Sequence, residues 1–241
     1  STAGKLWGRG IQSNGASQNL PQNASVAVNT TSIFTSTYGA SVITQYLNGT
    51  SVGSVAYDNT LQSWTDLGVG QQAGEPWNGD IAEVILFKSL VGSAQRIIID
   101  NYLAAKYGLT LGSNDLYVED NSANGNYDHD VAGIGRISST DKQTDSRGSG
   151  IVEISGATGL GNNEFLFWGD DNAALGTFGV GDKPIGVQGR WQRTWRVSEV
   201  KTTGASTDVG DIDMAFDLAG EGAITASDLR LLIDTDNDGL F

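Results

Sequence analysis

The sequence predicts an all-β protein built from two antiparallel β-sandwiches, with one helix at the junction between them. Glycine occurs 33 times and proline 3 times in 241 residues, a balance typical of short strands joined by tight turns. Many short segments alternate apolar and polar side chains at the two-residue period of half-buried strands. One segment alone combines a helical pattern with signals for both helix ends.

Composition excludes several classes of function. The chain carries 14 Lys and Arg against 28 Asp and Glu, a formal net charge of −14, so it repels nucleic acid and anionic lipid headgroups, and we expect neither as a partner. The absence of cysteine excludes disulfides, zinc–thiolate sites and thiol nucleophiles. No apolar run approaches the roughly 18 residues of a membrane span, and no secretory signal is present, so we expect no membrane insertion.

The first half predicts strands and a hairpin. Residues 25–47 alternate apolar side chains with Thr, Ser and Gln, which indicates two or three antiparallel strands. Asn48 and Gly49 then separate two alternating stretches, and both tolerate the positive φ of a type I′ turn. Further along, "IAEVILF" at residues 81–87 predicts a strand that is buried on much of its surface.

The helix is predicted over residues 93–107. Ser93 is placed to cap its start, and Gly108 stands where a left-handed C-terminal cap belongs. We expect this helix to close the first domain, so the predicted domains are residues 1–110 and 111–241.

The second half predicts a second sandwich. Five short runs are separated by Gly, Asn and Asp clusters: "GIVEI", "EFLFWG", "RTWRVSEV", "DIDMAFDL" and "DLRLLID". Trp168, Trp191 and Trp195 suggest a platform for stacking sugars, but packing in the core is favoured because Trp195 and Val197 share one strand face.

Several of these segments resemble known families. "YLNGTSVGSV", "WNGDIAEVILF" and "NYLAAKYGLTL" resemble, over about residues 32–111, the closing half of bacterial laminin-G-like domains with a concanavalin A-type sandwich. This resemblance implies a partial concanavalin A-like jelly roll whose opening strands are missing or donated by another segment.

The second half is similar to another module. "DHDVAGIGR", "EFLFWGDDNAAL", "RTWRVSE" and "DLRLLIDTDNDG" resemble, in this order, an uncharacterised β-rich module that often follows laminin-G-like domains in very large secreted or surface proteins of bacteria. The resemblance implies an extracellular or cell-surface location, with the export signal outside this segment.

The last residues predict a metal site. Asp234, Asp236 and Asp238, followed by Gly239, match the first half of a D-x-[DN]-x-[DN]-G calcium loop, in which alternate carboxylates converge on one cation. The acidic residue expected at the twelfth position of the loop would lie beyond Phe241, so we expect the second module to be truncated there. An acidic turn that binds no metal is the alternative.

Four further aspartates are candidate calcium ligands. Asp128 and Asp130 flank His129, and on a strand they would face one side while the histidine faces the other, which argues against a zinc or histidine-based site. Asp170 and Asp171 are also candidates, although a turn or an Asx cap is the favoured interpretation.

The sequence supports no catalytic residues, and we predict a non-enzyme. The nearest candidate for the carboxylate pair of a glycoside hydrolase, Asp80 with Glu83, would lie on opposite faces of a strand and so could not act on one glycosidic bond. The loop before it could hold a ligand at the rim of the sandwich, although joining two strands is its favoured role. Its candidate ligand-binding residues are Gln72, Glu75, Trp77, Asn78 and Asp80.

These observations predict a non-catalytic segment of a large extracellular bacterial adhesin or surface fibre, built from calcium-supported β-sandwiches. Its expected partners are adjacent domains or strands of the same polypeptide. One alternative is a lectin-like module that binds a carbohydrate through loops of the first sandwich. A further alternative is a filament subunit completed by strands donated from neighbouring copies.

Overall fold

The computed structural model describes residues 4–5, 9–11, 17–19, 25–39, 41–57, 71–72, 75–76, 78–176, 178–222, 224–236 and 238–241. The chain divides into two compact units, Ser1–Val91 and Gly92–Phe241. Each unit is described by itself.

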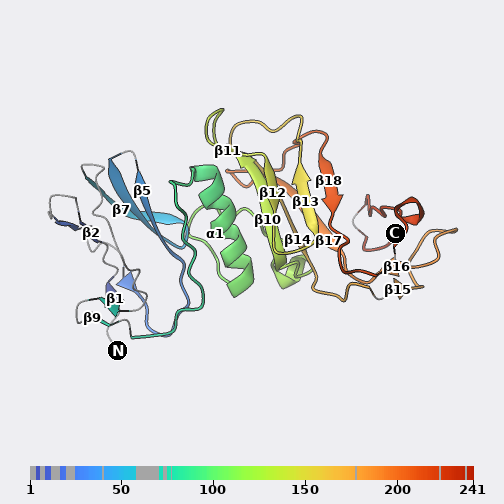
Figure 1. Cartoon of the computed structure of the whole chain (residues 1–241), viewed down its shortest axis with the longest axis horizontal. Coiled ribbons are helices and arrows are strands. Elements are labelled where there is room, and N and C mark those ends of the chain that lie inside the picture. The colour runs from blue at the N-terminus through green and yellow to red at the C-terminus, as the bar shows by residue number, and fades with distance from the viewer. Residues whose placement is uncertain are drawn as a thin grey trace. The chain divides into compact units, whose positions relative to one another are not determined.

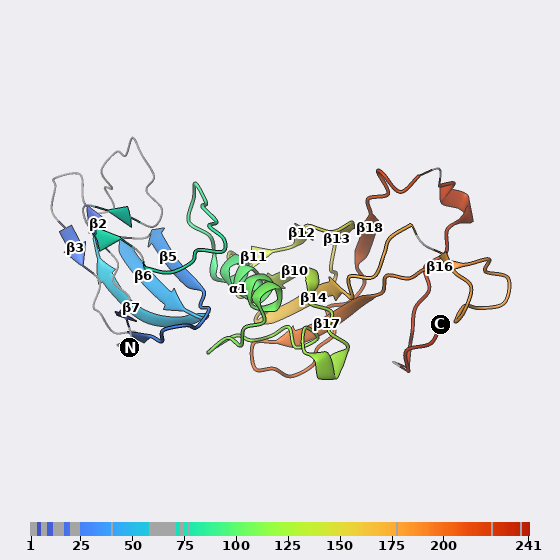
Figure 2. The same ribbon diagram turned by 90° about the horizontal axis from the view of Figure 1, so that it is seen from below.

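The first unit is built around an antiparallel sheet of three strands, β5 (Phe34–Gly39), β6 (Val42–Leu47) and β7 (Thr50–Ala56) (Figure 2). Three smaller antiparallel pairs accompany it: β1 (Gly4–Lys5) with β4 (Ser25–Val26), β2 (Arg9–Ile11) with β3 (Ser17–Asn19), and β8 (Gln71–Gln72) with β9 (Glu75–Pro76). The antiparallel strands predicted within residues 25–47 are therefore confirmed.

The hairpin predicted at Asn48 and Gly49 is also confirmed. These two residues connect β6 to β7, Leu47 pairs with Thr50, and the φ angles of Asn48 and Gly49 are 47° and 78°. Asn48 in addition exchanges two hydrogen bonds with Ile33: its N–H donates to the Ile33 carbonyl at 2.9 Å, and its Oδ1 accepts from the Ile33 N–H at 2.8 Å. The turn is thus fixed to the preceding segment as well as to its own strands.

The strand predicted at residues 81–87 is wrong. The segment has no regular secondary structure, and its large apolar side chains are exposed: Ile81, Val84, Ile85, Leu86 and Phe87. Apolar character indicates only that burial would be favourable. A strand buried on both faces also needs paired neighbours and covering layers, and the described residues provide this segment with neither.

The helix α1 (Ser93–Tyr107) has the predicted bounds. Gly108 ends it in the left-handed conformation at φ 62°, and its N–H donates to the Ala104 and Ala105 carbonyls, as expected of a C-terminal cap. None of the helices in the described part of the chain has the length and hydropathy needed to cross a membrane.

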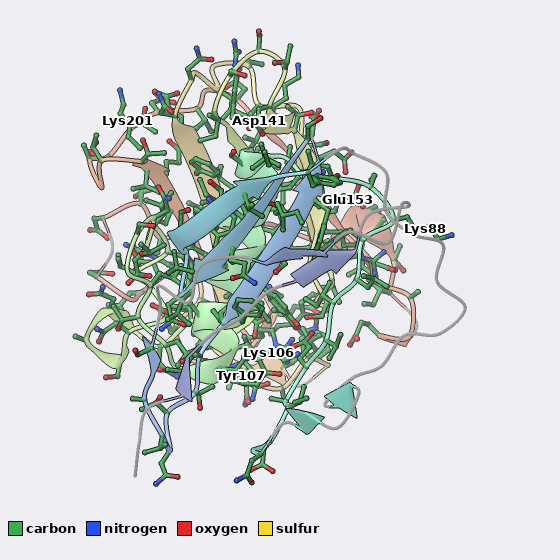
Figure 3. The ribbon with its side chains drawn as sticks, turned by 90° about the vertical axis from the view of Figure 1, so that its left-hand side faces the viewer. Lys88, Lys106, Tyr107, Asp141, Glu153 and Lys201 are labelled. Atoms are coloured by element: carbon green, nitrogen blue, oxygen red, sulfur yellow. The ribbon has the colours of Figure 1, made fainter. Side chains whose placement is uncertain are left out.

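The N-terminal cap of α1 was predicted wrongly. Gly92 occupies the cap position and Ser93 is already helical. The carboxylate of Asp141 caps the helix instead: Oδ2 accepts from the Ser93 N–H and Oδ1 from the Ala94 N–H, both at 3.0 Å (Figure 3). A Cβ on residue 92 would lie 2.4 Å from Asp141 Oδ1, so glycine is needed for this close approach.

The second unit contains two packed antiparallel sheets. The larger sheet has the order β11-β10-β14-β17, and the smaller has the order β12-β13-β18. The two cores described below place α1, the larger sheet and the smaller sheet in three successive layers, and Figure 1 shows the helix beside β10 and β11. The bounds of their strands are β10 (His129–Arg136), β11 (Lys142–Gln143), β12 (Asp145–Arg147), β13 (Val152–Ser155), β14 (Glu164–Asp170), β17 (Trp195–Lys201) and β18 (Asp213–Phe216). The predicted second β-sandwich is present, with a helix covering one of its outer faces.

Two hydrophobic cores separate these layers. Phe165 and Phe167 of β14 pack into the core beneath α1, whereas Leu166 and Trp168 of the same strand pack into the core between the sheets. The predicted burial of Trp168 is thus confirmed. Gly133 and Gly135 of β10 lie directly opposite Phe167 and Phe165, and a Cβ on either glycine would come within 3 Å of the facing ring.

The division of the chain differs from the prediction. The boundary was expected near residue 110, after the helix, but the compact units divide between Val91 and Gly92. The helix belongs to the second unit because its apolar face, with Ala94, Ile97 and Ile98, is buried in a core shared with β10 and β14.

Four of the five runs predicted as strands in the second half contain one, namely β13, β14, β17 and β18. The fifth, "DLRLLID", is wrong. A 3₁₀ helix, η2 (Ala226–Asp228), ends at its first residue, and the rest has no regular structure. Away from the two sheets, the unit contains a second 3₁₀ helix, η1 (Ser122–Asn124), and a short pair formed by β15 (Phe178–Gly179) and β16 (Arg190–Trp191).

Candidate metal centre

The predicted calcium loop brings three acidic side chains together. Asp234, Asp236 and Asp238 each offer a carboxylate oxygen, and these oxygens lie within 4.8 Å of one another. Among the described residues, these three form the one group of acidic or histidine side chains close enough to hold a metal ion. Gly239 has a φ of 83°, the left-handed conformation that lets the chain turn after the third aspartate.

Hydrogen bonds to backbone amides close this loop. Asp234 Oδ2 accepts from the Gly239 N–H at 2.9 Å, and Asp238 Oδ1 accepts from the Leu240 N–H at 2.8 Å. Ca²⁺ takes six to eight oxygen ligands, and carboxylates, backbone carbonyls and water can all supply them. The three aspartates therefore fit part of a calcium shell.

The end of the loop is held against the β15–β16 pair. The Phe241 N–H donates to Asp182 Oδ1 at 2.9 Å, and the guanidinium of Arg190 lies 4.9 Å from the centroid of the Phe241 ring. Arg190 also forms an ion pair with Asp182 at 3.0 Å. The position of the acidic loop therefore depends on a segment that lies about 50 residues earlier in the chain.

Asp170 and Asp171 are engaged in turns at the end of β14. Asp170 Oδ1 accepts from the Asn172 N–H at 2.8 Å, and Asp171 Oδ1 accepts from the Ala173 N–H at 3.1 Å. Asp171 Oδ2 also accepts from the Thr194 hydroxyl at 2.8 Å. The Asx turns favoured by the sequence are confirmed.

An arginine lies between two of the remaining candidate ligands. Arg193 Nη1 is 3.5 Å from Asp170 Oδ2 and 3.6 Å from Asp130 Oδ2. Asp170 is fully buried, and this burial raises its pKa, while the positive charge of Arg193 opposes the rise. A guanidinium at this position repels a metal cation, so the geometry favours a structural role for Asp130 and Asp170.

The strand alternation expected around His129 is wrong. Asp128 Oδ1 lies 2.6 Å from His129 Nδ1, so these two side chains meet instead of facing opposite sides. β10 begins at His129, its register shifts between His129 and Ala132, and Asp130 has a φ of 50°. A bulge of this kind breaks the two-residue alternation.

One acidic cluster was missed by the sequence analysis. The pKa of Asp120 is raised to about 6 by burial and by the nearby charges of Asp115, Asp128 and Glu119. These acids come from one irregular segment of the chain, which includes η1. No local pattern in the sequence shows that they approach one another, because that depends on how the segment folds back.

The candidate ligand-binding loop of the first unit is only partly described. Gln72 and Glu75 are paired residues of β8 and β9, Trp77 lies outside the described residues, and Asn78 and Asp80 are exposed. Asp80 and Glu83 do not lie on a strand, so the prediction that they face opposite sides of one strand is wrong.

Comparisons with known proteins agree with the division into two parts. A family model described as Domain of unknown function (DUF8202) matches residues 95–241. A second model, for the Concanavalin A-like lectin/glucanases superfamily, matches residues 1–97. No curated protein and no solved structure matches the chain. The predicted resemblances to a laminin-G-like, concanavalin A-like domain and to an uncharacterised β-rich module are confirmed.

Proposed function

The chain belongs to the family described as Domain of unknown function (DUF8202), and from this premise we propose that it is a non-catalytic, structural segment of a large extracellular surface protein of bacteria, an adhesin or a fibre. In this role its modules space and present other domains of the same polypeptide. Calcium bound by Asp234, Asp236 and Asp238 stabilises the second unit.

The convergence of these three carboxylates is the observation that carries the proposal. The other charged groups near the strand ends are held by one another or by the backbone: Arg193 lies between Asp130 and Asp170, Asp171 binds Thr194, and Asp128 binds His129. These ion pairs and hydrogen bonds fix the ends of the strands relative to one another, which supports a rigid, structural module.

Calcium would act by removing charge repulsion. Without a cation, three carboxylates within 4.8 Å of one another repel. A bound cation would neutralise this repulsion and fix the loop. Phe241 connects the end of the loop to Asp182 and Arg190. The free energy of unfolding then rises by RT ln(1 + [L]/Kd), which is about 2.7 kcal/mol at one hundred times Kd.

The test is thermal unfolding of the chain in EDTA and in millimolar calcium. We expect calcium to raise Tm, and magnesium to raise it less because its smaller, stricter octahedral shell fits this loop poorly. Asp236→Asn should reduce the calcium shift. Asp228→Asn is the matched control, since Asp228 is an exposed acid outside the group. Equal Tm values in EDTA and calcium, or an undiminished shift in Asp236→Asn, would contradict the calcium site.

A second candidate function is carbohydrate binding by the first unit. It is supported by the match of residues 1–97 to a superfamily described as lectins and glucanases. A glycan array probed with the whole chain tests it. Binding that a free sugar competes away, and that Trp77→Ala or Asp80→Ala abolishes, would establish a lectin. An absence of binding to every glycan on the array would favour the structural role.

The non-catalytic part of the proposal has its own test. The superfamily that matches the first unit includes glucanases, so the chain should be assayed against a panel of polysaccharides, and we expect no turnover. Hydrolysis that is lost in Asp80→Ala or Glu83→Ala would overturn this part, whatever the outcome of the calcium measurement.

A further inference from the structure

The smaller sheet of the second unit has an open edge. β18 is its last strand in the order β12-β13-β18, and within the described residues no strand pairs with its other side. The facing sheet has four strands. The smaller sheet therefore covers the shared core with one strand fewer than the larger sheet presents to it.

The core is incompletely covered at this edge. Ile154 and Leu166, near the middle of the two sheets, are 0% exposed. Met214 and Phe216 of β18 pack against the same core but are only half-buried, as is Trp195, whose ring meets Phe216 edge-on at 5.7 Å. A fourth strand beside β18 would cover these side chains.

One nearby segment has the side-chain pattern of such a strand. Leu229, Leu231 and Ile233 alternate with Arg230 and Leu232, and the three odd-numbered side chains are 43%, 62% and 66% exposed. Side chains at a two-residue spacing lie on one face of an extended chain. Residues 229–233 have no regular structure, so this apolar face is formed only when the segment becomes a strand.

We propose that residues 229–233 are a strap that docks antiparallel on the free edge of β18 and becomes the fourth strand of the smaller sheet. Residues 217–228 connect the two segments and allow the chain to reverse direction. Leu229, Leu231 and Ile233 then extend the apolar face formed by Met214 and Phe216. The docked strap also covers the unpaired backbone groups of an exposed edge strand.

The polar face agrees with this arrangement. Asp213 and Ala215 are the outward residues of β18, with alternate residues of the strand half-buried. In the docked strap, Arg230 and Leu232 share this outward face. In the register that pairs Ala215 with Arg230, the arginine lies diagonally across from the carboxylate of Asp213, within reach of its long side chain, whereas a register shifted by one residue would place Arg230 against the core.

Cysteine trapping tests the strap, because the chain has no cysteine of its own. Ala215→Cys is combined with Arg230→Cys in one variant and with Leu232→Cys in another, so that both pairing registers are covered. Paired antiparallel residues lie about 4.5–5.5 Å apart at Cα, within the range that a disulfide spans. The matched control combines Ala215→Cys with Ile185→Cys, an exposed apolar residue outside both segments.

After mild oxidation, peptide mapping by mass spectrometry measures the disulfide within one chain. We expect one of the two strap pairs to form it at least tenfold faster than the control pair. Formation at the control rate, or disulfides that join two copies instead, would overturn the proposal. Trapping in EDTA separates the strap from the calcium site: a disulfide formed there supports the strap even if calcium leaves Tm unchanged.

Discussion

Two seven-residue apolar segments of this protein differ in secondary structure and in burial. "IAEVILF" at residues 81–87 has no regular structure and exposes Ile81, Leu86 and Phe87, whereas "EFLFWGD" forms β14 and buries every residue from Phe165 to Asp170. Both contain apolar residues without strict alternation. Apolar content therefore does not separate a central strand from an exposed segment.

Their surroundings separate them. β14 pairs with β10 on one side and β17 on the other, and apolar cores lie against both of its faces. Its Phe165 and Phe167 rings stack with centroids 5.8 Å apart, over strand positions where β10 carries glycine. Residues 81–87 pair with no strand among the described residues. A neighbouring strand must supply both hydrogen bonds and complementary space before apolar side chains are buried.

The largest expected effect on stability comes from truncating one phenylalanine to alanine in each segment. Phe167→Ala should lower the free energy of unfolding by about 3–5 kcal/mol, because it leaves a cavity in a core where the ring is fully buried. Phe87→Ala removes a ring that is 49% exposed, and it should cost less than about 1 kcal/mol. Urea unfolding measures both, and similar losses would show that the two segments are buried alike.

A second test adds a methyl group at Gly133 of β10, where the absence of a side chain leaves space for β14. A Cβ at residue 133 would lie 2.8 Å from the Phe167 ring and 3.0 Å from the Leu166 carbonyl oxygen. Gly133→Ala should therefore cost about 1–3 kcal/mol through overpacking. Gly181→Ala is the control, since nothing lies within 4 Å of its new Cβ. Equal unfolding midpoints for the two variants would mean that β10 shifts to accommodate the added methyl group without a loss of stability.

The helix that covers β14 depends on a cap from outside the helix. Asp141→Ala removes the acceptor for two N–H groups of α1, and it should cost about 0.5–2 kcal/mol, the range for losing a side-chain cap. Asp145→Ala changes an exposed aspartate of β12 and serves as the control. The helical signal in circular dichroism should be lost at lower temperature in Asp141→Ala only, and coincident melting curves would rule out this capping role.

The smallest effect concerns Asp120, an acid that is half-buried although its charge disfavours burial, whereas the apolar segment at residues 81–87 is exposed although burial would favour it. The pKa of Asp120 in the folded protein is about 6, above about 3.9 in an unfolded chain. The folded state thus binds this proton more tightly, and its contribution to stability is present below about pH 4 and is lost as pH rises through 6.

Asp120→Asn keeps the shape of the side chain and removes the charge. Its Tm should exceed that of the unmodified protein at pH 7, and the difference should disappear near pH 4. Differential scanning calorimetry at the two pH values measures this. A constant difference across the range would show that the charge of Asp120 is not responsible.

The acidic loop at residues 234–239 was predictable because its ligand pattern is local. Alternate aspartates followed by glycine bring carboxylates together through the geometry of one turn, and these oxygens do converge. The clusters around Arg193 and Asp120 were not predictable. The first brings together groups from separate strands and loops, Asp130 and Asp170 with Arg193. The second depends on how the one irregular segment that carries Asp115, Asp120 and Asp128 folds back on itself.

By itself the sequence determined the features that depend on neighbours along the chain: the β-rich class, the positive φ of Asn48 and Gly49, and the end of α1 at Gly108. Their causes are backbone conformation and hydrogen bonds a few residues apart. Only the tertiary structure decided that Asp141 caps α1, that the helix packs in the second unit, and that residues 81–87 are exposed. Capping across the fold and burial both depend on distances between segments that are remote in the sequence, because packing acts through space.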